Sequence, residues 1–549
     1  KGFTTRCWTL GSPSEEGEAQ QYDSLLWCLR DTATHHRYRL AIRRSQCTRT
    51  STLALMGARG LDPVPRLITP PDGAPSNHKD DMRILLSARR FVPPFTGGVD
   101  VYTDRLARAL QRLGHEVAVL ALESSAAGNG TDIVISRDHY RGLEVQRLVF
   151  DVASRPQRAF DSGYDAEMGQ VLGRVLAEQK PDLFIVMNFY LVTLAAVEVA
   201  EALGIPVVHI ATDFVPICRR ATFIRWDGEP CRAGESIKSC SACFVSHRSA
   251  GRLASTVLNR LPEERLTRLA RAQGSSAPLH PLRLLRPYWK QVTLMEQRLQ
   301  TIQPLREKIA LVFAPTQYTL NAFLQNGFTP DQTHLLPFAV ETDHPLSRIE
   351  RGPARHPRFL FVGRLQPYKG AHLLVEAFNA LASPGEATLT LYGGPDGYPA
   401  YYERVQALIA SNERIRFAGT IEPAALGDAF ADADVFVLPS TWHENSPLIL
   451  LDALQSGTPV IASDVGGITD MIDHGGNGLL FPMGDRDALQ ELLQQVIDQP
   501  EVLGRLRPEM NLPSIDTYAA TVIDMTLARV GRTSRSHLPA DRQRREWSR

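Results

Sequence analysis

The residues best suited to chemistry in this chain are two cations and two carboxylates in its second half. Gly363, Arg364 and Lys369 share the stretch GRLQPYKG, which follows the apolar run FLFV and precedes a predicted helix. An arginine offers a planar fork for phosphate oxygens, and a lysine offers a compact point charge. Because α/β sheets place ligands at the carboxyl ends of their strands, this loop is predicted to bind an anion.

The two carboxylates belong to the stretch WHENSPLILLDALQSGTPV. Ser446 is expected to cap a helix whose first residue is Pro447, because both residue types favour those positions. Glu444 precedes this start, and Asp452 lies about one and a half turns into the helix. Since one carboxylate can accept hydrogen bonds from two hydroxyl groups, the pair suits a polyhydroxylated ligand.

Two glycine pairs are predicted to let the backbone approach a ligand closely. Gly97 and Gly98 end the loop PPFTGG and directly precede a helical pattern, so free backbone amides at that helix start favour an anion. Gly466 and Gly467 follow the predicted strand PVIAS. A glycine pair before a helix is often only a turn, so each pair alone is a weak signal.

The elements that must position these residues alternate between strand and helix. Predicted strands include Ile84–Ala88, EVAVLAL, DLFIVM, IPVVHIA and IALVFAP, and then RFLFVG, ATLTLYG, RIRFAG, DVFVLPS and PVIAS. Such alternation predicts parallel sheets covered by helices on both faces. The pattern restarts after Val340, so we expect two doubly wound α/β domains over 82–340 and 341–515, followed by a helix over 516–530.

Length and composition limit the alternatives. A chain of 549 residues is too long for one core. Its 60 basic and 60 acidic residues balance, which argues against a nucleic-acid partner. No stretch reads as an export signal or a membrane span, so the predicted location is the cytoplasm. Residues 1–81 are predicted to be a non-native extension before a start at Met82, or a disordered arm, and 531–549 a disordered basic tail.

A long insertion, about 214–308, offers two further readings. It holds four cysteines, which could bind a structural zinc ion or remain free thiols. These are Cys218, Cys231, Cys240 and Cys243. Its later part is rich in arginine and forms either a solvated helical face, which we favour, or a surface for peripheral contact with an anionic membrane. These arginines are Arg248, Arg252, Arg260, Arg265, Arg268, Arg271, Arg283 and Arg286.

From Met82 to about Val530 the chain resembles the retaining, family-four glycosyltransferases of GT-B fold. Four motifs in order carry the resemblance: PPFTGGVDVYTDRLARAL, FVGRLQPYKG, FAGTIEP and WHENSPLILLDALQSGTPVIASDVGG. The resemblance implies two facing Rossmann-like domains with an interdomain cleft. It also implies a nucleoside diphosphate sugar donor in the second domain, a saccharide or lipid-linked acceptor in the first, and no metal in catalysis. The insertion is similar to one found in some members.

The resemblance also assigns roles to individual residues. Arg364 and Lys369 would grip the donor diphosphate, Glu444 would touch the donor sugar, and Asp452 would hold the ribose hydroxyls. The remaining assignments place glycines and their neighbours around the donor, and one aspartate in catalysis. They comprise Gly97, Gly98, Gly363, Thr420 and Ile421 near donor or base, Gly466, Gly467 and Ile468 as amide donors, and Asp213 as catalytic.

Two departures from the family pattern concern the site. The family's second acidic residue is usually Glu, and here Asp452 is one methylene shorter. A family His-Asp pair reads Thr212-Asp213 here, while His209 lies in the preceding strand, where a structural role is the commoner one. The alternatives left open are a sugar-nucleotide epimerase of the same fold, a non-catalytic sugar-nucleotide binder, and a nucleic-acid module.

Overall fold

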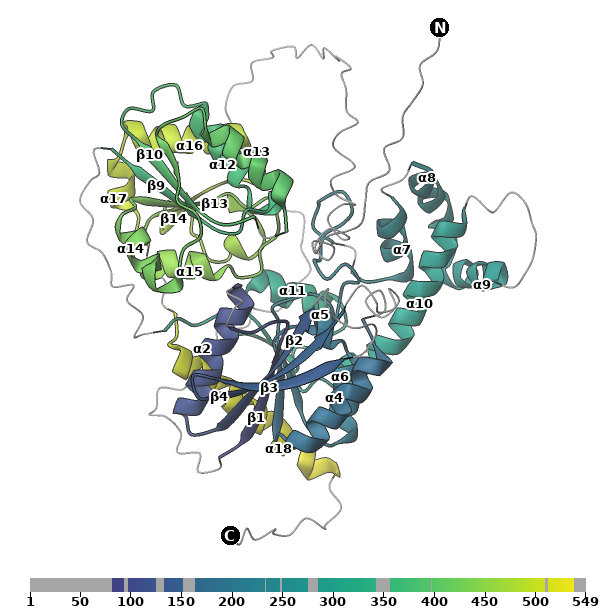
Figure 1. Cartoon of the computed structure of the whole chain (residues 1–549). Helices are drawn as coiled ribbons and strands as arrows, with labels where there is room; N and C mark the ends of the chain where they lie inside the picture. Colours follow the sequence, from purple (N-terminus) through teal and green to yellow (C-terminus); the bar gives the residue numbers. More distant parts are fainter. Residues whose placement is uncertain are drawn as a thin grey trace, which may run out of the picture.

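The computed structural model describes residues 81–92, 97–124, 133–151, 163–232, 234–246, 249–274, 285–341, 356–395, 397–508 and 512–537. The predicted N-terminal extension, apart from Asp81, lies outside these residues, as do Pro93 and Pro94 of the first glycine-bearing loop. The described residues form two α/β domains, each built on one sheet (Figure 1).

The N-terminal domain holds an eight-stranded sheet with the order β3-β4-β2-β1-β5-β6-β7-β8. All neighbours are parallel except β3 and β4, an antiparallel pair at one edge that the predicted all-parallel sheet lacks. The strands are β1 (Arg83–Ala88), β2 (Glu116–Ser124), β3 (Val134–Tyr140), β4 (Leu143–Phe150), β5 (Leu183–Val186), β6 (Val207–Ile210), β7 (Leu311–Ala314) and β8 (Thr333–Leu335).

Helices cover both faces of this sheet, as the alternating pattern predicts. They are α2 (Gly98–Arg112), α4 (Ala166–Gln179), α5 (Phe189–Val192), α6 (Ala195–Ala202) and α11 (Gln317–Gln325). In α2, Tyr102, Leu106 and Leu110 recur at helical spacing and are fully buried. The helix begins after Gly97, whose amide donates to the Asp100 carboxylate at 3.1 Å, so its start is held in place within the protein.

The insertion after β6 forms helices that stand beside this domain (Figure 1). They are α7 (Ile237–Val245), α8 (Ser249–Leu258), α9 (Glu263–Gly274) and α10 (Arg286–Glu307). Glu235 ties the start of the insertion to α10 by accepting hydrogen bonds from buried Arg298 and Arg306. Those two arginines also donate to the backbone carbonyls of Val215 and Pro216. This buried ion-pair network holds the insertion together. The insertion is attached to the domain by the Glu235 amide, which donates to Asn326 Oδ1 at 2.6 Å.

The C-terminal domain holds a six-stranded, fully parallel sheet with the order β11-β10-β9-β12-β13-β14. Its strands are β9 (Arg358–Val362), β10 (Thr388–Tyr392), β11 (Ile415–Phe417), β12 (Val435–Leu438), β13 (Val460–Asp464) and β14 (Gly478–Pro482). Its helices are η2 (Pro367–Lys369), α12 (Ala371–Asn379), α13 (Pro399–Ile409), η3 (Pro423–Ala425), α14 (Leu426–Ala431), α15 (Leu448–Gln455), η4 (Gly466–Ile468), α16 (Arg486–Asp498) and α17 (Glu501–Arg505).

The chain crosses between the domains twice, and the two crossings lie side by side. Val340 bridges Ser514, and the amide of Ile515 donates to the Val340 carbonyl at 3.0 Å. The last helix, α18 (Ile515–His537), then returns to the N-terminal domain and packs on α2, where the Tyr102 and Tyr518 rings meet edge to face. The predicted disordered tail is wrong for residues 531–537, which continue this helix; 538–549 lie outside the described residues.

Candidate active site between the two domains

The loop after β9 brings the predicted cations to the edge of the C-terminal domain that faces the other domain. Lys369 ends η2, and its Nζ lies 2.7 Å from Glu444 Oε1. The same oxygen accepts a hydrogen bond from the Ser440 hydroxyl at 2.8 Å. The Glu444 side chain is 8% exposed and that of Lys369 20%, so this ion pair is mostly shielded from water. Two predicted site residues, 75 positions apart in sequence, therefore meet directly.

Arg364 and Gly363 occupy the start of the same loop. The Gly363 amide donates to the Tyr392 carbonyl at 3.0 Å, which ties the loop to the neighbouring strand. Arg364 is exposed, and its charge acts on Arg89 and Asp100 of the N-terminal domain. The loops after β1 and β9 thus bring cations from both domains close enough to interact.

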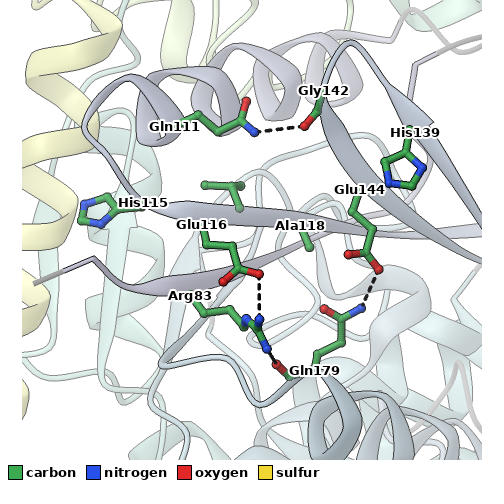
Figure 2. A pocket seen from close by; sticks show the side chains of 10 residues that line it. Arg83, Gln111, His115, Glu116, Ala118, His139, Gly142, Glu144 and Gln179 are labelled. Carbon is green, nitrogen blue, oxygen red and sulfur yellow. Dashed lines mark hydrogen bonds and ion pairs between the residues drawn. The ribbon is translucent and has the colours of Figure 1, made fainter. Parts of the chain in front are cut away.

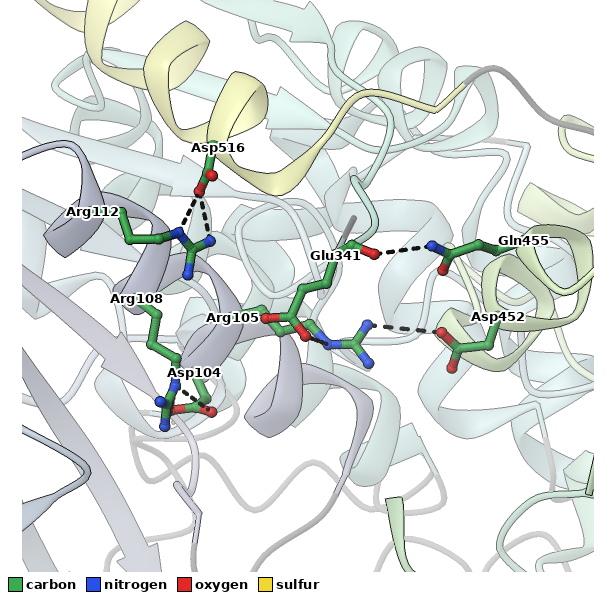
Figure 3. A network of polar contacts seen from close by, with 8 residues as sticks. All are labelled: Asp104, Arg105, Arg108, Arg112, Glu341, Asp452, Gln455 and Asp516. Carbon is green, nitrogen blue, oxygen red and sulfur yellow. Dashed lines mark hydrogen bonds and ion pairs between the residues drawn. The ribbon is translucent and has the colours of Figure 1, made fainter. Parts of the chain in front are cut away.

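Asp452 lies in α15, buried where the two domains meet (Figure 3). Its Oδ1 is 3.8 Å from Nη1 of Arg105 on α2, and Arg105 also lies 3.6 Å from Glu341 between the domains. Burial raises the pKa of Asp452 to about 6, against the lowering effect of Arg105. Ser446 does not cap α15 as predicted: Pro447 is the N-cap residue, and the Ser446 hydroxyl contacts the Met471 sulfur at 3.9 Å.

Two of the three amides predicted to bind the donor at the second glycine pair already have partners in the protein. The Gly467 amide donates to the Glu444 carbonyl at 2.7 Å and the Ile468 amide to the Val465 carbonyl at 3.1 Å, so neither is free to bind a donor in this conformation. What the turn requires is the absence of a side chain, because a Cβ on Gly467 would lie 1.7 Å from the Asn445 carbonyl oxygen. The turn supports the backbone at Glu444.

The remaining predicted donor contacts of this domain lie after β11. Thr420 is exposed, while Ile421 is half-buried and packs against the core cluster that also includes residues of α15. Their assigned place near the base stays a prediction.

In the N-terminal domain, Gly98 at the start of α2 faces the C-terminal domain. Gly98 is exposed and lies beside Leu448, the first residue of α15. Gly97 lies beside Arg90, whose Nε is 4.0 Å from the Asp100 carboxylate. The start of α2, an arginine and the start of α15 therefore come together at one boundary between the domains.

Asp213 is buried, and backbone amides occupy both of its carboxylate oxygens. The amide of Phe189 donates to one at 2.6 Å and that of Val215 to the other at 2.8 Å. Burial raises its pKa to about 6, although these hydrogen bonds oppose the rise. Asp213 thereby fixes the start of α5, which carries Tyr190. This geometry suits a positioning role, and the predicted catalytic role stays a prediction.

His209 and Thr212 face the domain interior. The His209 ring is fully buried between Phe189 and Phe323, and its Nδ1 donates to the Val186 carbonyl at 2.8 Å. Burial lowers its pKa to about 4, so the ring is neutral near pH 7. Thr212 donates to the Met187 carbonyl. His209 is a core residue, as expected for a lone histidine in a strand.

The cysteines of the insertion are free thiols in this structure. Cys218 and Cys231 pack against one core cluster, whereas Cys240 and Cys243 lie one turn apart on α7. Burial raises the pKa of Cys218 to about 11 and also raises those of Cys240 and Cys243. Within the described ranges, no three His, Cys, Asp or Glu side chains are arranged to hold a metal ion, so the geometry does not fit the zinc alternative.

The arginine-rich stretch of the insertion contains both ion-paired and solvent-exposed arginines. Arg271 pairs with Glu296 of α10, at 2.6 Å. Arg265, Arg268 and Arg286 are exposed, which agrees with a solvated face, while Arg248 and Arg283 lie outside the described residues. No helix in the described parts of the chain has the length and apolar character that crossing a bilayer requires.

A cavity of about 220 Å³ lies at the opposite end of the N-terminal sheet (Figure 2). Its charged lining is internally paired, with Arg83 bonded to Glu116 at 2.8 Å and Gln179 to Glu144 at 3.3 Å. Arg83 begins β1, whereas the glycine loop follows the end of that strand. This cavity is therefore separate from the interdomain site, and none of the predicted site residues lines it.

Sequence reasoning missed three residues at the site: Arg89, Arg90 and Arg105. The first two directly follow β1, in the same loop as Gly97 and Gly98. Adjacent arginines at the carboxyl end of a strand were the available signal. Arg105 gave none, because only its contacts across the domain boundary distinguish it from the other charged residues of α2.

Comparison with known proteins agrees with this architecture. Residues 356–499 match the "Glycosyl transferases group 1" family model, and residues 97–260 match the "Glycosyl transferase 4-like domain" model. The catalytic domain of starch synthase IV from Arabidopsis thaliana superposes with a TM-score of 0.52, at 14% identity, over 82% of this chain and 100% of that one.

Curated relatives match over a shorter length. A D-inositol 3-phosphate glycosyltransferase from Corynebacterium glutamicum is 34% identical over 167 residues, which are 29% of this chain and 40% of that protein. The sulfoquinovosyl transferase SQD2 of Arabidopsis thaliana is 33% identical over 181 residues, 32% of this chain and 33% of that protein. The matches thus span two fifths or less of these relatives. The two domains thus each match a glycosyltransferase domain model, and the fold of the chain is GT-B.

Proposed function

We propose that this protein transfers a hexosyl unit from a nucleoside diphosphate sugar to a hydroxyl of a saccharide or lipid-linked acceptor. We further propose that the reaction retains the anomeric configuration and needs no metal ion. The observation that carries the proposal is the Lys369–Glu444 pair, which lies in the same loop region as Arg364 at the carboxyl end of β9. A sugar diphosphate is bound best where cations for its phosphates and a carboxylate for its sugar hydroxyls lie close together.

The roles of the chain's own groups follow from the bond that breaks. The bond between sugar C1 and the diphosphate oxygen breaks, and its electron pair leaves with the diphosphate. Arg364 and Lys369 stabilise that growing negative charge from fixed positions. The acceptor oxygen forms the new bond to C1, and its proton passes to the leaving phosphate oxygen. Because amides occupy both oxygens of Asp213, this carboxylate is poorly placed as a nucleophile, which favours attack from the front face.

Glu444 and Asp452 would orient the carbohydrate parts of the donor. Glu444 is fixed by Lys369 and Ser440, so its second carboxylate oxygen is held in one orientation for a sugar hydroxyl. Asp452 would accept from the ribose hydroxyls while Arg105 remains nearby.

A thermal-shift panel of UDP-, GDP- and ADP-hexoses tests the donor assignment, because a ligand that binds the native state raises its melting temperature. The stabilising donor is then incubated with and without candidate acceptors, and products are separated by chromatography. We expect transfer only with an acceptor present. Change of the donor alone would indicate an epimerase, and binding without transfer to any acceptor would indicate a non-catalytic binder.

A further inference from the structure

Two consecutive arginines after β1 diverge toward different partners. Arg90 points to the start of α2, where it lies 4.0 Å from Asp100 and beside Gly97. The Arg89 guanidinium instead lies over the Tyr190 ring, 4.6 Å from its centroid. Tyr190 belongs to α5, which follows β5, the strand beside β1 in the sheet. Arg90 therefore contacts the start of α2, and Arg89 contacts α5 of the same domain.

The position of Arg89 is built by the N-terminal domain alone. The Tyr190 ring on which it stacks is held in place, because the Asp213 carboxylate accepts a hydrogen bond from the Phe189 amide at the start of α5. Asn188 caps the same short helix by accepting from the Tyr190 amide at 2.9 Å. A guanidinium stacked on a ring that is itself fixed loses little conformational freedom when it binds an anion.

Arg89 also has no ion-pair partner among the described residues. Among the described residues, Lys369 pairs with Glu444 and Arg90 lies by Asp100, but no carboxylate lies within ion-pair distance of Arg89. Its side chain is exposed to solvent, yet the surrounding protein lowers its pKa by desolvation, and the charges of Arg90 and Arg364 lower it further. Like charges this close repel one another, so an anion bound at Arg89 would also be stabilised by Arg90 and Arg364.

We infer that Arg89 binds a phosphate group of the acceptor, so that the acceptor is a phosphorylated saccharide. This inference rests on the proposed function, in which Arg364 and Lys369 of the other domain already serve the donor diphosphate. A monoester on a soluble sugar and a diphosphate joining a sugar to a lipid present the same oxygens to a guanidinium. Tyr190 contributes by holding the cation, and Asp213 by holding Tyr190.

Calorimetric titration with the nucleotide site filled separates this assignment from the donor assignment. The full-length protein is first titrated with UDP, GDP and ADP, and the tightest nucleotide is kept saturating. It is then titrated with methyl α-glucoside, glucose 1-phosphate and glucose linked through diphosphate to a citronellyl chain. We expect glucose 1-phosphate or the citronellyl compound to bind at least tenfold more tightly than the neutral glucoside, and the better of the two identifies the source of the phosphate.

The variant Arg89→Gln should abolish that preference and change nucleotide affinity less than twofold, while Arg89→Lys should keep part of it. Arg268→Gln, an exposed arginine on α9, is the matched control and should behave as the wild type. Equal binding of the neutral and phosphorylated sugars by the wild type would overturn the assignment, as would equal loss of nucleotide and sugar-phosphate affinity in Arg89→Gln. Failure of every nucleotide to bind the wild type would instead refute the proposed function.

Discussion

Replacing Lys369 by methionine tests the cation on which the proposed mechanism depends most. Methionine keeps much of the side-chain volume and removes the charge that lies 2.7 Å from Glu444 Oε1. Removing one donor that stabilises developing negative charge typically costs about 2.7–4 kcal/mol of transition-state stabilisation. We therefore expect kcat to fall about 100- to 1000-fold, measured with the donor identified by thermal shift.

The same change should lower stability, because it leaves the buried Glu444 carboxylate with Ser440 as its remaining side-chain partner among the described residues. Leaving such a group without its partner costs about 1–3 kcal/mol, and the partial exposure of Lys369 favours the lower end of that range. The expected loss corresponds to a fall in melting temperature of roughly 2–4 °C per kcal/mol for a domain of this size. Arg404→Met is the matched control, since Arg404 pairs with Glu376 at 3.0 Å on the surface. It should cost less than about 1 kcal/mol and leave transfer unchanged.

A double-mutant cycle with Glu444→Gln separates two roles for Lys369. If Lys369 acts on the diphosphate, Lys369→Met still lowers kcat strongly when residue 444 is glutamine. If it only positions Glu444, the second substitution adds almost nothing. The stability loss should shrink in the double variant in either case, because no unpaired charge remains. Unchanged turnover in Lys369→Met, with native melting behaviour, would refute the assigned role.

Three further variants probe the groups around this pair. Gly467→Ala should destabilise the protein by at least about 1–3 kcal/mol, because its Cβ would collide with the Asn445 carbonyl. Gly504→Ala has open space around it and should not lower the melting temperature, which thermal melts of both variants would show. Donor affinity should fall as the pH drops below about 6, because the raised pKa of Asp452 removes the charge that accepts ribose hydroxyls; Asp452→Asn should bind weakly at every pH, seen by titration. Asp213 holds its proton more tightly in the folded than in the unfolded chain, so its contribution makes stability fall as the pH rises from about 4 to 6; Asp213→Asn should flatten that part of the denaturation profile.

The strands of the C-terminal domain could be read from the sequence because they are short, apolar and buried on both faces. The predicted strand over 358–363 is observed as Arg358–Val362, and the one over 434–440 as Val435–Leu438. The strand β3 was not predicted because it is an edge strand and is almost wholly exposed. Such a strand lacks the apolar signal that marks an interior strand.

The site was predictable where one loop carried the signal and unpredictable where contacts join distant segments. The loop after β9 showed Arg364 and Lys369 directly, because cations after a buried strand already indicate an anion site. The ion pair between Lys369 and Glu444 depends on how β9 and β12 lie side by side, which no local spacing reveals. The amide of Gly467 was misassigned for the same reason, since its acceptor, the Glu444 carbonyl, follows a different strand.

Asp452 interacts with a cation of the other domain. Its carboxylate lies on the C-terminal domain, while its cation, Arg105, belongs to α2 of the N-terminal domain and also lies near Glu341 at the crossing between them (Figure 3). A separation of 3.8 Å in a buried setting is sensitive to small shifts, because the interaction there is weakly screened. Ribose hydroxyls that bind Asp452 would compete with Arg105 for the same oxygens. If Asp452 binds the donor as proposed, donor binding and the relative position of the two domains would be coupled through one guanidinium, which lies next to the crossing beside Val340.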